Sequence, residues 1–262
     1  MRTRIAPTPS GFLHLGNVFS FALTAALARR SGASILLRID DLDRERSRRA
    51  YVDDIFDTLT FMGIPWDEGP RNAEEFENAY SQAFRMDAYR DVLDRLSIQG
   101  ALFACTCSRA DTGPCSCVRK GIPLGTDGVS WRLHAEDIEL KNFVVRRKDG
   151  IPAYQVTSVV DDLRYGVDLV VRGEDLRPST EAQRFLAAQL GEGAFGKITF
   201  HHHPLLQGPS GEKLSKSAGA ASIRYLRTLG LSARDVYGRI GELLGAPSPP
   251  ATWEELAEMS RS

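Results

Sequence analysis

Apolar and polar positions at the start of the chain follow the order strand, helix, strand. Residues 3–6 are strand-like and lead into a turn rich in proline and glycine. Residues 18–30 are rich in Phe, Leu and Ala, which predicts a helix that ends at Ser31-Gly32. Residues 34–39 form a continuous apolar run of the length of a buried parallel strand. The pattern therefore predicts a parallel βαβ unit.

The rest of the chain continues this alternation. Residues 103–128 and 203–219 are rich in Gly, Pro and Ser, which predicts loops. The other expected elements are, in chain order, a helix capped by Ser47 that ends before Gly63, a charged helix over residues 74–99, strands over 129–133, 143–146 and 169–172, a helix over 179–190 and a helical tail. The predicted fold class is α/β with a Rossmann-like parallel sheet.

Composition and charge exclude several classes of protein. The 33 Lys and Arg residues are balanced by 34 Asp and Glu, so any nucleic-acid surface has to be a local basic patch. No apolar run reaches the roughly 18 residues of a membrane span, and the first residues do not read as a signal peptide. Four clustered cysteines are too few for a secreted disulfide framework. We therefore expect a cytoplasmic protein with no membrane partner.

The turn between the first strand and the first helix carries the first candidate site. Its sequence over residues 6–16 is Ala-Pro-Thr-Pro-Ser-Gly-Phe-Leu-His-Leu-Gly. In this position His14 and the helix N-terminal amides face the open end of a parallel sheet, where anionic ligands bind. Gly16 has no Cβ, so a flat adenine has room against the backbone. The alternative is an ordinary turn with a surface histidine.

A second motif, Lys213-Leu214-Ser215-Lys216, lies in the later Gly- and Ser-rich segment. Two lysines this close suit the neutralisation of a polyphosphate, although a solvated basic loop is the alternative. Together the Pro-x-Pro-x-Gly-x-x-His-x-Gly turn and the Lys-Leu-Ser-Lys motif resemble the two signatures of class I aminoacyl-tRNA synthetases.

Further segments narrow this resemblance to one branch of the class. Residues 38–46, 66–70, 159–162 and 171–175 are similar to strings of the glutamyl-tRNA synthetase catalytic domain. Only residues 220–262 follow, too few for an anticodon-binding region, and such a chain resembles the glutamyl-queuosine tRNA(Asp) synthetase family. That family activates glutamate with ATP and transfers it to the queuosine base of tRNA(Asp), which makes tRNA and glutamate the expected partners of a monomeric ligase.

The resemblance implies a Rossmann-like class I synthetase catalytic domain with a small zinc-bearing insertion and a short helical C-terminal segment. The implied division places the first half of the catalytic domain at residues 1–102 and the insertion at 103–142. The second half, with the lysine motif, spans residues 143–230, and the helical tail spans 231–262.

The resemblance also implies a role for individual residues. His14, Lys213 and Lys216 are expected to act on the phosphates, with Mg²⁺ alongside. The expected ATP contacts are Pro9, Gly16, Asn17, His202, Leu214 and Ser215. The expected glutamate contacts are Arg4, Ala6, Thr8, Asp40, Tyr154, Ser158 and Arg172.

The expected amino-acid pocket departs from the family at three positions. Asp40 stands where the family has Glu, and Thr8 and Ser158 also differ from it. These differences keep open a stand-alone ligase that uses another amino acid or another acceptor. A catalytically inactive paralogue that binds RNA or a protein is a third reading, although the presence of the signature residues argues against it.

Four cysteines in two Cys-x-Cys pairs form a candidate metal site. Cys105 and Cys107 are separated from Cys115 and Cys117 by seven residues, and four thiolates are enough for tetrahedral zinc. Reduced thiols and a disulfide are the alternatives. The resembled family binds zinc in this insertion with one Cys-x-Cys pair and later Tyr and Cys ligands, so the second Cys-x-Cys pair is a departure.

Overall fold

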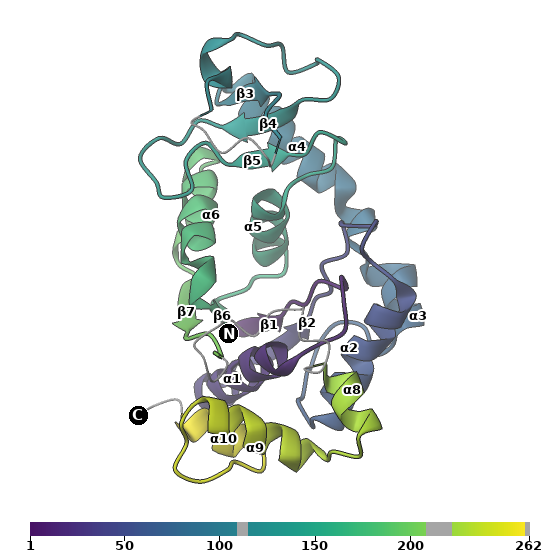
Figure 1. The fold of residues 1–262 in the computed structure, drawn as a ribbon. Helices are drawn as coiled ribbons and strands as arrows, with labels where there is room; N and C mark the ends of the chain where they lie inside the picture. Colours follow the sequence, from purple (N-terminus) through teal and green to yellow (C-terminus); the bar gives the residue numbers. More distant parts are fainter. Residues whose placement is uncertain (109–114, 208–221, 260–262) are drawn as a thin grey trace. The chain divides into compact units, whose positions relative to one another are not determined.

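A computed structural model of the chain describes residues 1–108, 115–207 and 222–259 (Figure 1). The chain divides into two compact units. Unit 1 consists of Met1–Phe84, Val167–Asp175 and Thr199–Ser262, and unit 2 consists of Arg85–Gly166 and Leu176–Ile198. The four-part division that the resemblance implies remains a prediction.

Unit 1 is built on a four-stranded parallel sheet. Its strands are β1 (Arg2–Ile5), β2 (Ser34–Leu37), β6 (Leu169–Gly173) and β7 (Thr199–His203), in the order β2-β1-β6-β7. All three pairings are parallel. The carboxyl ends of the four strands therefore lie at one edge of the sheet. This arrangement confirms the predicted α/β fold and its βαβ unit, while β7 was not predicted as a strand.

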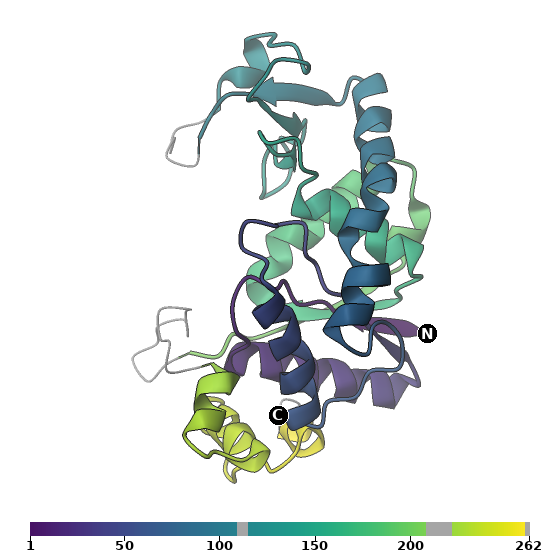
Figure 2. The same cartoon turned by 90° about the vertical axis from the view of Figure 1, so that its right-hand side faces the viewer.

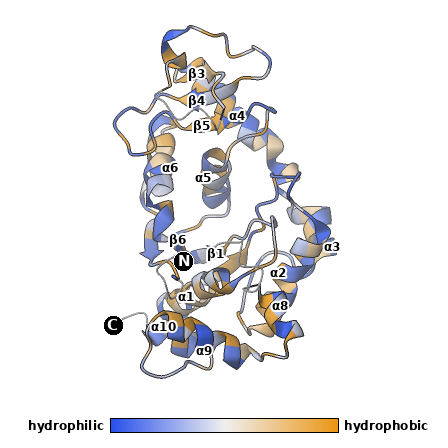
Figure 3. Cartoon of the chain, viewed as in Figure 1, coloured by the Kyte–Doolittle hydropathy of each residue, from blue (hydrophilic) through white to orange (hydrophobic). Residues whose placement is uncertain are grey.

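Helix α1 (Leu15–Ser31) connects β1 to β2 and forms the centre of the core of unit 1. It is apolar on nearly all sides (Figure 3), because it packs against β1 and β6 and also against α10 (Trp253–Met259). A helix that is hydrophobic all round is a buried helix. Val18, Phe19 and Ala22 accordingly have no more than 1% of their surface exposed.

The other helices of unit 1 cover this core. They are α2 (Arg49–Phe61), α3 (Ala73–Glu75), α8 (Ile223–Thr228) and α9 (Ala233–Leu243). Figure 2 shows α8, α9 and α10 gathered beside α1, which confirms the predicted helical tail. The predicted Ser47 cap is wrong, because Arg48 is the N-cap of α2 and makes no side-chain capping bond.

The predicted single helix over residues 74–99 is also wrong. The segment consists of α3, a π-helical turn (Phe76–Tyr80), a 3₁₀ turn (Gln82–Arg85) and α4 (Met86–Ile98). Ser81 has an extended ψ of 142° and interrupts the helix. The Asp41 carboxylate accepts hydrogen bonds from the Ser81 hydroxyl at 2.6 Å and from the Gln82 amide at 2.8 Å. A tertiary contact thus replaces the helical hydrogen bonds that the local sequence favours.

Unit 2 combines a three-stranded antiparallel sheet with four helices. The strands β3 (Leu102–Cys105), β4 (Ser130–Leu133) and β5 (Val144–Arg146) lie in chain order. The helices are α4, α5 (Tyr154–Arg164), α6 (Arg177–Gln189) and α7 (Gly193–Gly196). The predicted strands and the helix over residues 179–190 are confirmed to within two residues, whereas α5 was missed and β3 occupies the start of the segment that was predicted as a loop from residue 103.

A buried ionic network joins α4 to α5 inside unit 2. Arg85 donates to Asp161 at 2.7 Å, and the Tyr89 hydroxyl donates to the same carboxylate at 2.9 Å. The side chains of Arg85 and Asp161 are only 4% and 0% exposed. Burial raises the pKa of Tyr89, so its hydroxyl keeps the proton that it donates.

The Asp161→Ala variant tests this network. Because the change leaves the Arg85 charge buried without its partner, we expect the free energy of unfolding to fall by about 3–5 kcal/mol. Asp87→Ala is the control, since Asp87 lies on α4 in an exposed pair with Arg90 and its loss has little effect. Urea unfolding followed by circular dichroism measures both, and equal stability of the two variants would contradict the expectation.

Candidate functional site

The carboxyl edge of the unit 1 sheet gathers polar side chains from three of its strands. Arg4 lies near the end of β1, Arg172 near the end of β6, and His202 near the end of β7. Arg172 is paired in register with His202. Asp40 follows β2 by three residues, at the same edge. This edge is where ligands bind in open parallel α/β sheets.

Two backbone hydrogen bonds hold together the segments that follow β1 and β2. The Arg38 amide donates to the Ile5 carbonyl at 2.9 Å, and the Asp40 amide donates to the Pro7 carbonyl at 2.9 Å. The turn that contains Ala6, Thr8 and Pro9 therefore lies beside Asp40. The sequence-predicted residues of this turn and Asp40 are brought together in unit 1.

Three guanidinium groups are buried at this edge. Arg4, Arg38 and Arg172 are 6%, 4% and 5% exposed. Arg38 contacts Asp40 through a two-point ion pair of 2.8 and 3.1 Å, and Arg4 donates to the Val171 carbonyl at 3.5 Å. These four side chains carry three positive charges and one negative charge. Such an environment favours an anionic ligand with carboxylate groups.

His14 is the N-cap of α1, and its own helix fixes its ring. The Gly16 amide donates to His14 Nδ1 at 3.1 Å, and the His14 amide donates to the Asn17 side chain at 3.0 Å. Because Nδ1 is the acceptor, the proton of the neutral ring lies on Nε2. The helix N-terminus therefore presents an N–H donor at the end of the helix dipole that attracts anions.

Gly16 is required for this ring position. A Cβ built on Gly16 would lie 3.1 Å from His14 Cε1 and 3.2 Å from Nδ1, closer than ordinary van der Waals contact. Any side chain at residue 16 therefore requires the imidazole to shift by a few tenths of an ångström. Gly11, in the same turn, has nothing within 4 Å of such a Cβ.

The other two predicted glutamate contacts, Tyr154 and Ser158, belong to unit 2. They lie four residues apart on α5, so they share a helix face with Asp161, which anchors α5. Tyr154 is 42% exposed, whereas Ser158 is buried, and within the described part of the chain the Ser158 hydroxyl has no hydrogen-bond partner. An unpaired buried hydroxyl fits a ligand contact.

Four predicted site residues, Lys213, Leu214, Ser215 and Lys216, lie outside the described residues, so their roles remain predictions. Ser222, the first described residue after them, forms an antiparallel bridge with His14.

The three consecutive histidines of β7 have separate surroundings. His203 packs edge-on against Phe19 of α1, with ring centroids 4.9 Å apart, and its Nδ1 is 2.9 Å from the Pro204 carbonyl. Burial lowers the pKa of His203, so the ring is neutral and Nδ1 donates to that carbonyl. His202 instead stacks beside Phe200. The predicted contact between His202 and ATP remains untested.

All four cysteines converge at one point in unit 2. Their sulfur atoms lie within 4.8 Å of one another, with Cys105–Cys115, Cys107–Cys117 and Cys107–Cys115 separations of 3.5, 3.7 and 3.8 Å. A tetrahedron with zinc–sulfur distances of about 2.3 Å has sulfur–sulfur edges of about 3.8 Å. The cysteines are free rather than disulfide-bonded. The donor set and its dimensions therefore fit zinc.

The surroundings of the cysteines support a metal site. A hydrogen bond with the Thr106 backbone lowers the pKa of Cys117 to about 6, whereas hydrogen bonds with the neighbouring thiols raise the pKa of Cys107 and burial raises that of Cys115. Lys148 donates to the Thr106 carbonyl at 2.6 Å, and Ser130 donates to the Cys105 carbonyl at 3.1 Å. These bonds orient the first Cys-x-Cys pair, as outer contacts do around metal ligands.

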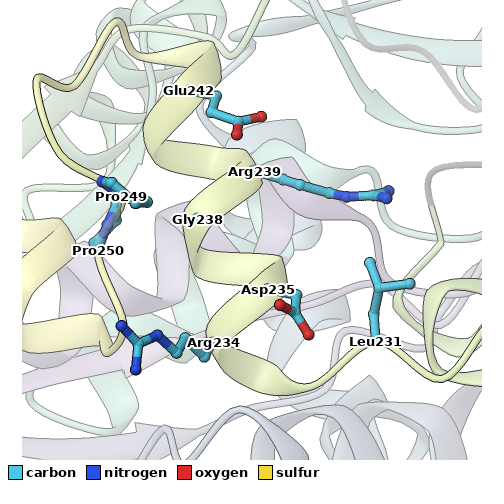
Figure 4. Close-up of a pocket in the computed structure, with 8 residues that line it drawn as sticks. All are labelled: Leu231, Arg234, Asp235, Gly238, Arg239, Glu242, Pro249 and Pro250. Atoms are coloured by element: carbon cyan, nitrogen blue, oxygen red, sulfur yellow. The ribbon is translucent and has the colours of Figure 1, made fainter.

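A groove of about 490 Å³ lies along α9, and none of the predicted site residues that the structure describes lines it (Figure 4). Figure 4 shows Asp235 and Arg239 extending from the same side of the helix. The groove is lined by Leu231, Arg234, Asp235, Gly238, Arg239, Glu242, Pro249 and Pro250. The mixture of arginines and acids gives this groove no clear preference for one ligand charge.

Sequence reasoning missed two charged residues beside the site. Arg38 is the ion-pair partner of Asp40. Asp54 of α2 is 3% exposed and accepts a hydrogen bond from the Leu13 amide at 2.8 Å. The sequence carried one signal for Asp54, because its carboxylate lies on the otherwise apolar face of a predicted helix. Acids are rarely buried without a partner, so this position indicated a specific contact. None of the helices in the described residues has the length and apolar character needed to cross a bilayer.

Comparison with known proteins identifies the family. The family model described as tRNA synthetases class I (E and Q), catalytic domain, matches residues 1–112 and 108–237. The chain belongs to this class I synthetase family. Glutamyl-Q tRNA(Asp) synthetase of Synechococcus sp. strain CC9605 is 39% identical over 95% of this chain and 85% of the relative.

Two further comparisons agree with this assignment. Glutamate–tRNA ligase 2 of Acidiphilium cryptum is 34% identical over 98% of this chain and 64% of that protein. The crystal structure of glutamate-tRNA synthetase from Elizabethkingia anophelis has a TM-score of 0.71 at 20% identity and covers 100% of this chain and 67% of that chain. The structural match shows the fold, and the predicted class I synthetase catalytic fold is thereby confirmed.

Gly16→Ala tests the position of the His14 ring in this class I synthetase. Because the new Cβ requires the imidazole to shift by a few tenths of an ångström, we expect the rate of ATP–pyrophosphate exchange to fall by up to about tenfold, since a misplacement of about 1 Å can cost about a hundredfold. Gly11→Ala is the matched control, since its Cβ meets nothing. Melting temperatures of both variants should stay near that of the wild type, and equal exchange rates would contradict the assignment.

Proposed function

We propose that this protein is an ATP-dependent ligase that activates glutamate as glutamyl-adenylate and transfers it to the queuosine base of tRNA(Asp). The observation that carries the proposal is the group of buried Arg4, Arg38 and Arg172 with Asp40 at the sheet edge that follows the His14 turn. This group suits an amino acid that has two carboxylates and one ammonium. The Synechococcus relative, whose name includes glutamyl-Q and tRNA(Asp), supports the same substrates.

Formation of an adenylate needs alignment and charge stabilisation more than proton transfer, because the attacking carboxylate is already ionised. His14 Nε2–H donates to the reacting phosphate, and the α1 N-terminus adds its dipole. Lys213 and Lys216 neutralise the departing pyrophosphate. When bound, Mg²⁺ supplies further charge neutralisation on the phosphates. Pro9, Gly16, Asn17, His202, Leu214 and Ser215 form the rest of the ATP site.

Glutamate recognition uses the same sheet edge. Arg4 and Arg172 bind the carboxylate end of the substrate, and Asp40 binds its amino group directly or through a water molecule. The ion pair with Arg38 orients Asp40, and a carboxylate has about four lone-pair positions, so it can accept a further bond. The family resemblance adds Ala6 and Thr8 of unit 1 and Tyr154 and Ser158 of unit 2 as further proposed contacts with glutamate.

A second candidate keeps the reaction and changes the amino acid or the acceptor. The two-point contact between Arg38 and the short Asp40 side chain favours it, because this contact neutralises much of the charge that would attract an ammonium group. Both candidates form an aminoacyl-adenylate and pass its amino acid to an acceptor, which is tRNA(Asp) in the first candidate and can be another RNA or a small molecule in the second. We further propose that the protein acts as a cytoplasmic monomer.

Exchange and transfer assays test the proposal together. Glutamate should support ATP–pyrophosphate exchange without tRNA, and Lys216→Ala should abolish it without a change in the circular dichroism spectrum. The activated glutamate should pass to tRNA(Asp) that contains queuosine and not to the same tRNA without the modification. Stronger exchange with a different amino acid would favour the second candidate, and equal transfer to both tRNAs would exclude queuosine as the acceptor.

We also propose that Cys105, Cys107, Cys115 and Cys117 bind one structural zinc ion. The sulfur separations support this. Zinc would tie the end of β3 to the segment after Cys115, because two ligands come from each side. The small apolar cluster of Phe103, Cys105 and Cys117 offers little other stabilisation there.

Removal of one thiolate tests the metal site. Purified wild-type protein should contain about one zinc per chain, and Cys107→Ser should lose most of it and melt at a lower temperature, because structural zinc contributes directly to folding. Ser116→Ala, an exposed position between two of the cysteines, is the matched control. Metal analysis by mass spectrometry measures the content. A full zinc complement in Cys107→Ser would contradict the four-cysteine assignment.

A further inference from the structure

Helix α2 places a carboxylate against the backbone of the turn that carries His14. Asp54 is 3% exposed, and its Oδ2 accepts a hydrogen bond from the Leu13 amide at 2.8 Å. Leu13 directly precedes His14 in the chain. A buried carboxylate destabilises a fold unless its charge is compensated. The position of Asp54 therefore needs an explanation beyond the packing of α2.

The same residue, Leu13, is held on its other side by the start of α8. The Leu13 carbonyl accepts a hydrogen bond from the Ile223 amide at 2.8 Å. The next residue of the turn, His14, forms an antiparallel bridge with Ser222. Both backbone polar groups of Leu13 are thus engaged, one by α2 and one by α8. This residue joins the two helices to the turn.

Side-chain stacking reinforces the arrangement at Phe12. Its ring meets Tyr51 edge-on, with centroids 5.0 Å apart, and the Arg224 guanidinium lies 4.8 Å from its centre. Tyr51 and Asp54 are three residues apart on α2 and therefore face the same side. One face of α2 thus holds the Phe12 ring and the Leu13 amide.

The charges around Asp54 explain how its carboxylate is tolerated. Burial raises the pKa of Asp54, and the neighbouring Asp57 raises it further. The Leu13 hydrogen bond and the positive charges of Arg224 and Arg227 on α8 act in the opposite direction. The ionised form is therefore favoured by the turn and by α8, the two segments that Asp54 connects to α2.

We propose that Asp54 is a positioning residue that sets the place of His14 by holding the Leu13 amide between α2 and α8. This inference rests on the proposed adenylate-forming reaction, in which His14 acts on the phosphate. Without the carboxylate the Leu13 amide loses its partner and the turn can shift. Because a displacement of about 1 Å can reduce a catalysed rate by about a hundredfold, a small shift at Leu13 is enough to matter.

A purely structural role for Asp54 predicts a different result. Loss of packing alone would lower the stability of unit 1 without acting selectively on the phosphate step. The proposed amino-acid contacts Arg4 and Arg172 lie on β1 and β6. Asp54 makes its hydrogen bond to Leu13 instead of to either of these strands. A positioning role therefore predicts that kcat falls while the KM for glutamate stays the same.

Three variants separate these roles in ATP–pyrophosphate exchange. Asp54→Ala should reduce kcat by about ten- to a hundredfold with an unchanged KM for glutamate. Asp54→Asn keeps an oxygen that can accept from Leu13, so it should retain most of the wild-type kcat. Asp53→Ala is the matched control, because Asp53 is an exposed neighbour on α2 that pairs with Arg49. Should Asp54→Ala fail to fold, Asp54→Ser replaces it.

Amide hydrogen exchange gives a readout that does not depend on activity. The Leu13 amide should exchange faster in Asp54→Ala than in the wild type and Asp54→Asn, at temperatures where melting curves show all three folded. An unchanged kcat or an unchanged Leu13 exchange rate in folded Asp54→Ala would overturn the proposal. If the wild type shows no ATP–pyrophosphate exchange with glutamate, the proposed function fails. The hydrogen-exchange rate of the Leu13 amide then still shows whether Asp54 holds this amide.

Discussion

Parallel pairing of β1 with β2 and β6 is the constraint on which the candidate site depends. The pairing brings the ends of strands that are far apart in the sequence to one edge of the sheet. Arg4, Asp40 and Arg172 meet there for this reason, although no local pattern links them. Each guanidinium would be unfavourable if it were buried alone, and the site therefore combines them with a carboxylate and with carbonyl acceptors.

Helix α1 contributes to the candidate site in two ways. Its body stabilises the core of unit 1, and its N-terminus positions His14. The body is apolar on nearly all sides and fills the core between the sheet and α10. Its N-terminus is organised by a reciprocal cap between His14 and Asn17. The rigid body fixes the direction of the helix, and the cap fixes the tautomer and the orientation of the imidazole. Placement of the proposed catalytic group on a rigid element meets the physical requirement for preorganisation.

The departures from expectation have a common cause. The segment over residues 74–99 has helical composition, yet Asp41, forty residues earlier in the chain, bonds Ser81 and Gln82 and divides it. The Ser47 cap fails because the chain becomes helical one residue later than expected, after Arg48. In both cases the local preference amounts to about 1 kcal/mol or less per residue, and at Ser81 and Gln82 the tertiary hydrogen bonds to Asp41 outweigh it.

By itself the sequence determined the parallel α/β class, the positions of most strands, the signature turn around His14 and the four-cysteine site. These features depend on short-range periodicity or on residues within a dozen positions of one another, so a linear reading captures them. Only the tertiary structure decided that Arg38 pairs with Asp40, that Asp54 holds Leu13, and that Arg85 and Asp161 join α4 to α5. Such contacts depend on which side chains become neighbours after the chain has folded, and burial then sets the strength of each interaction.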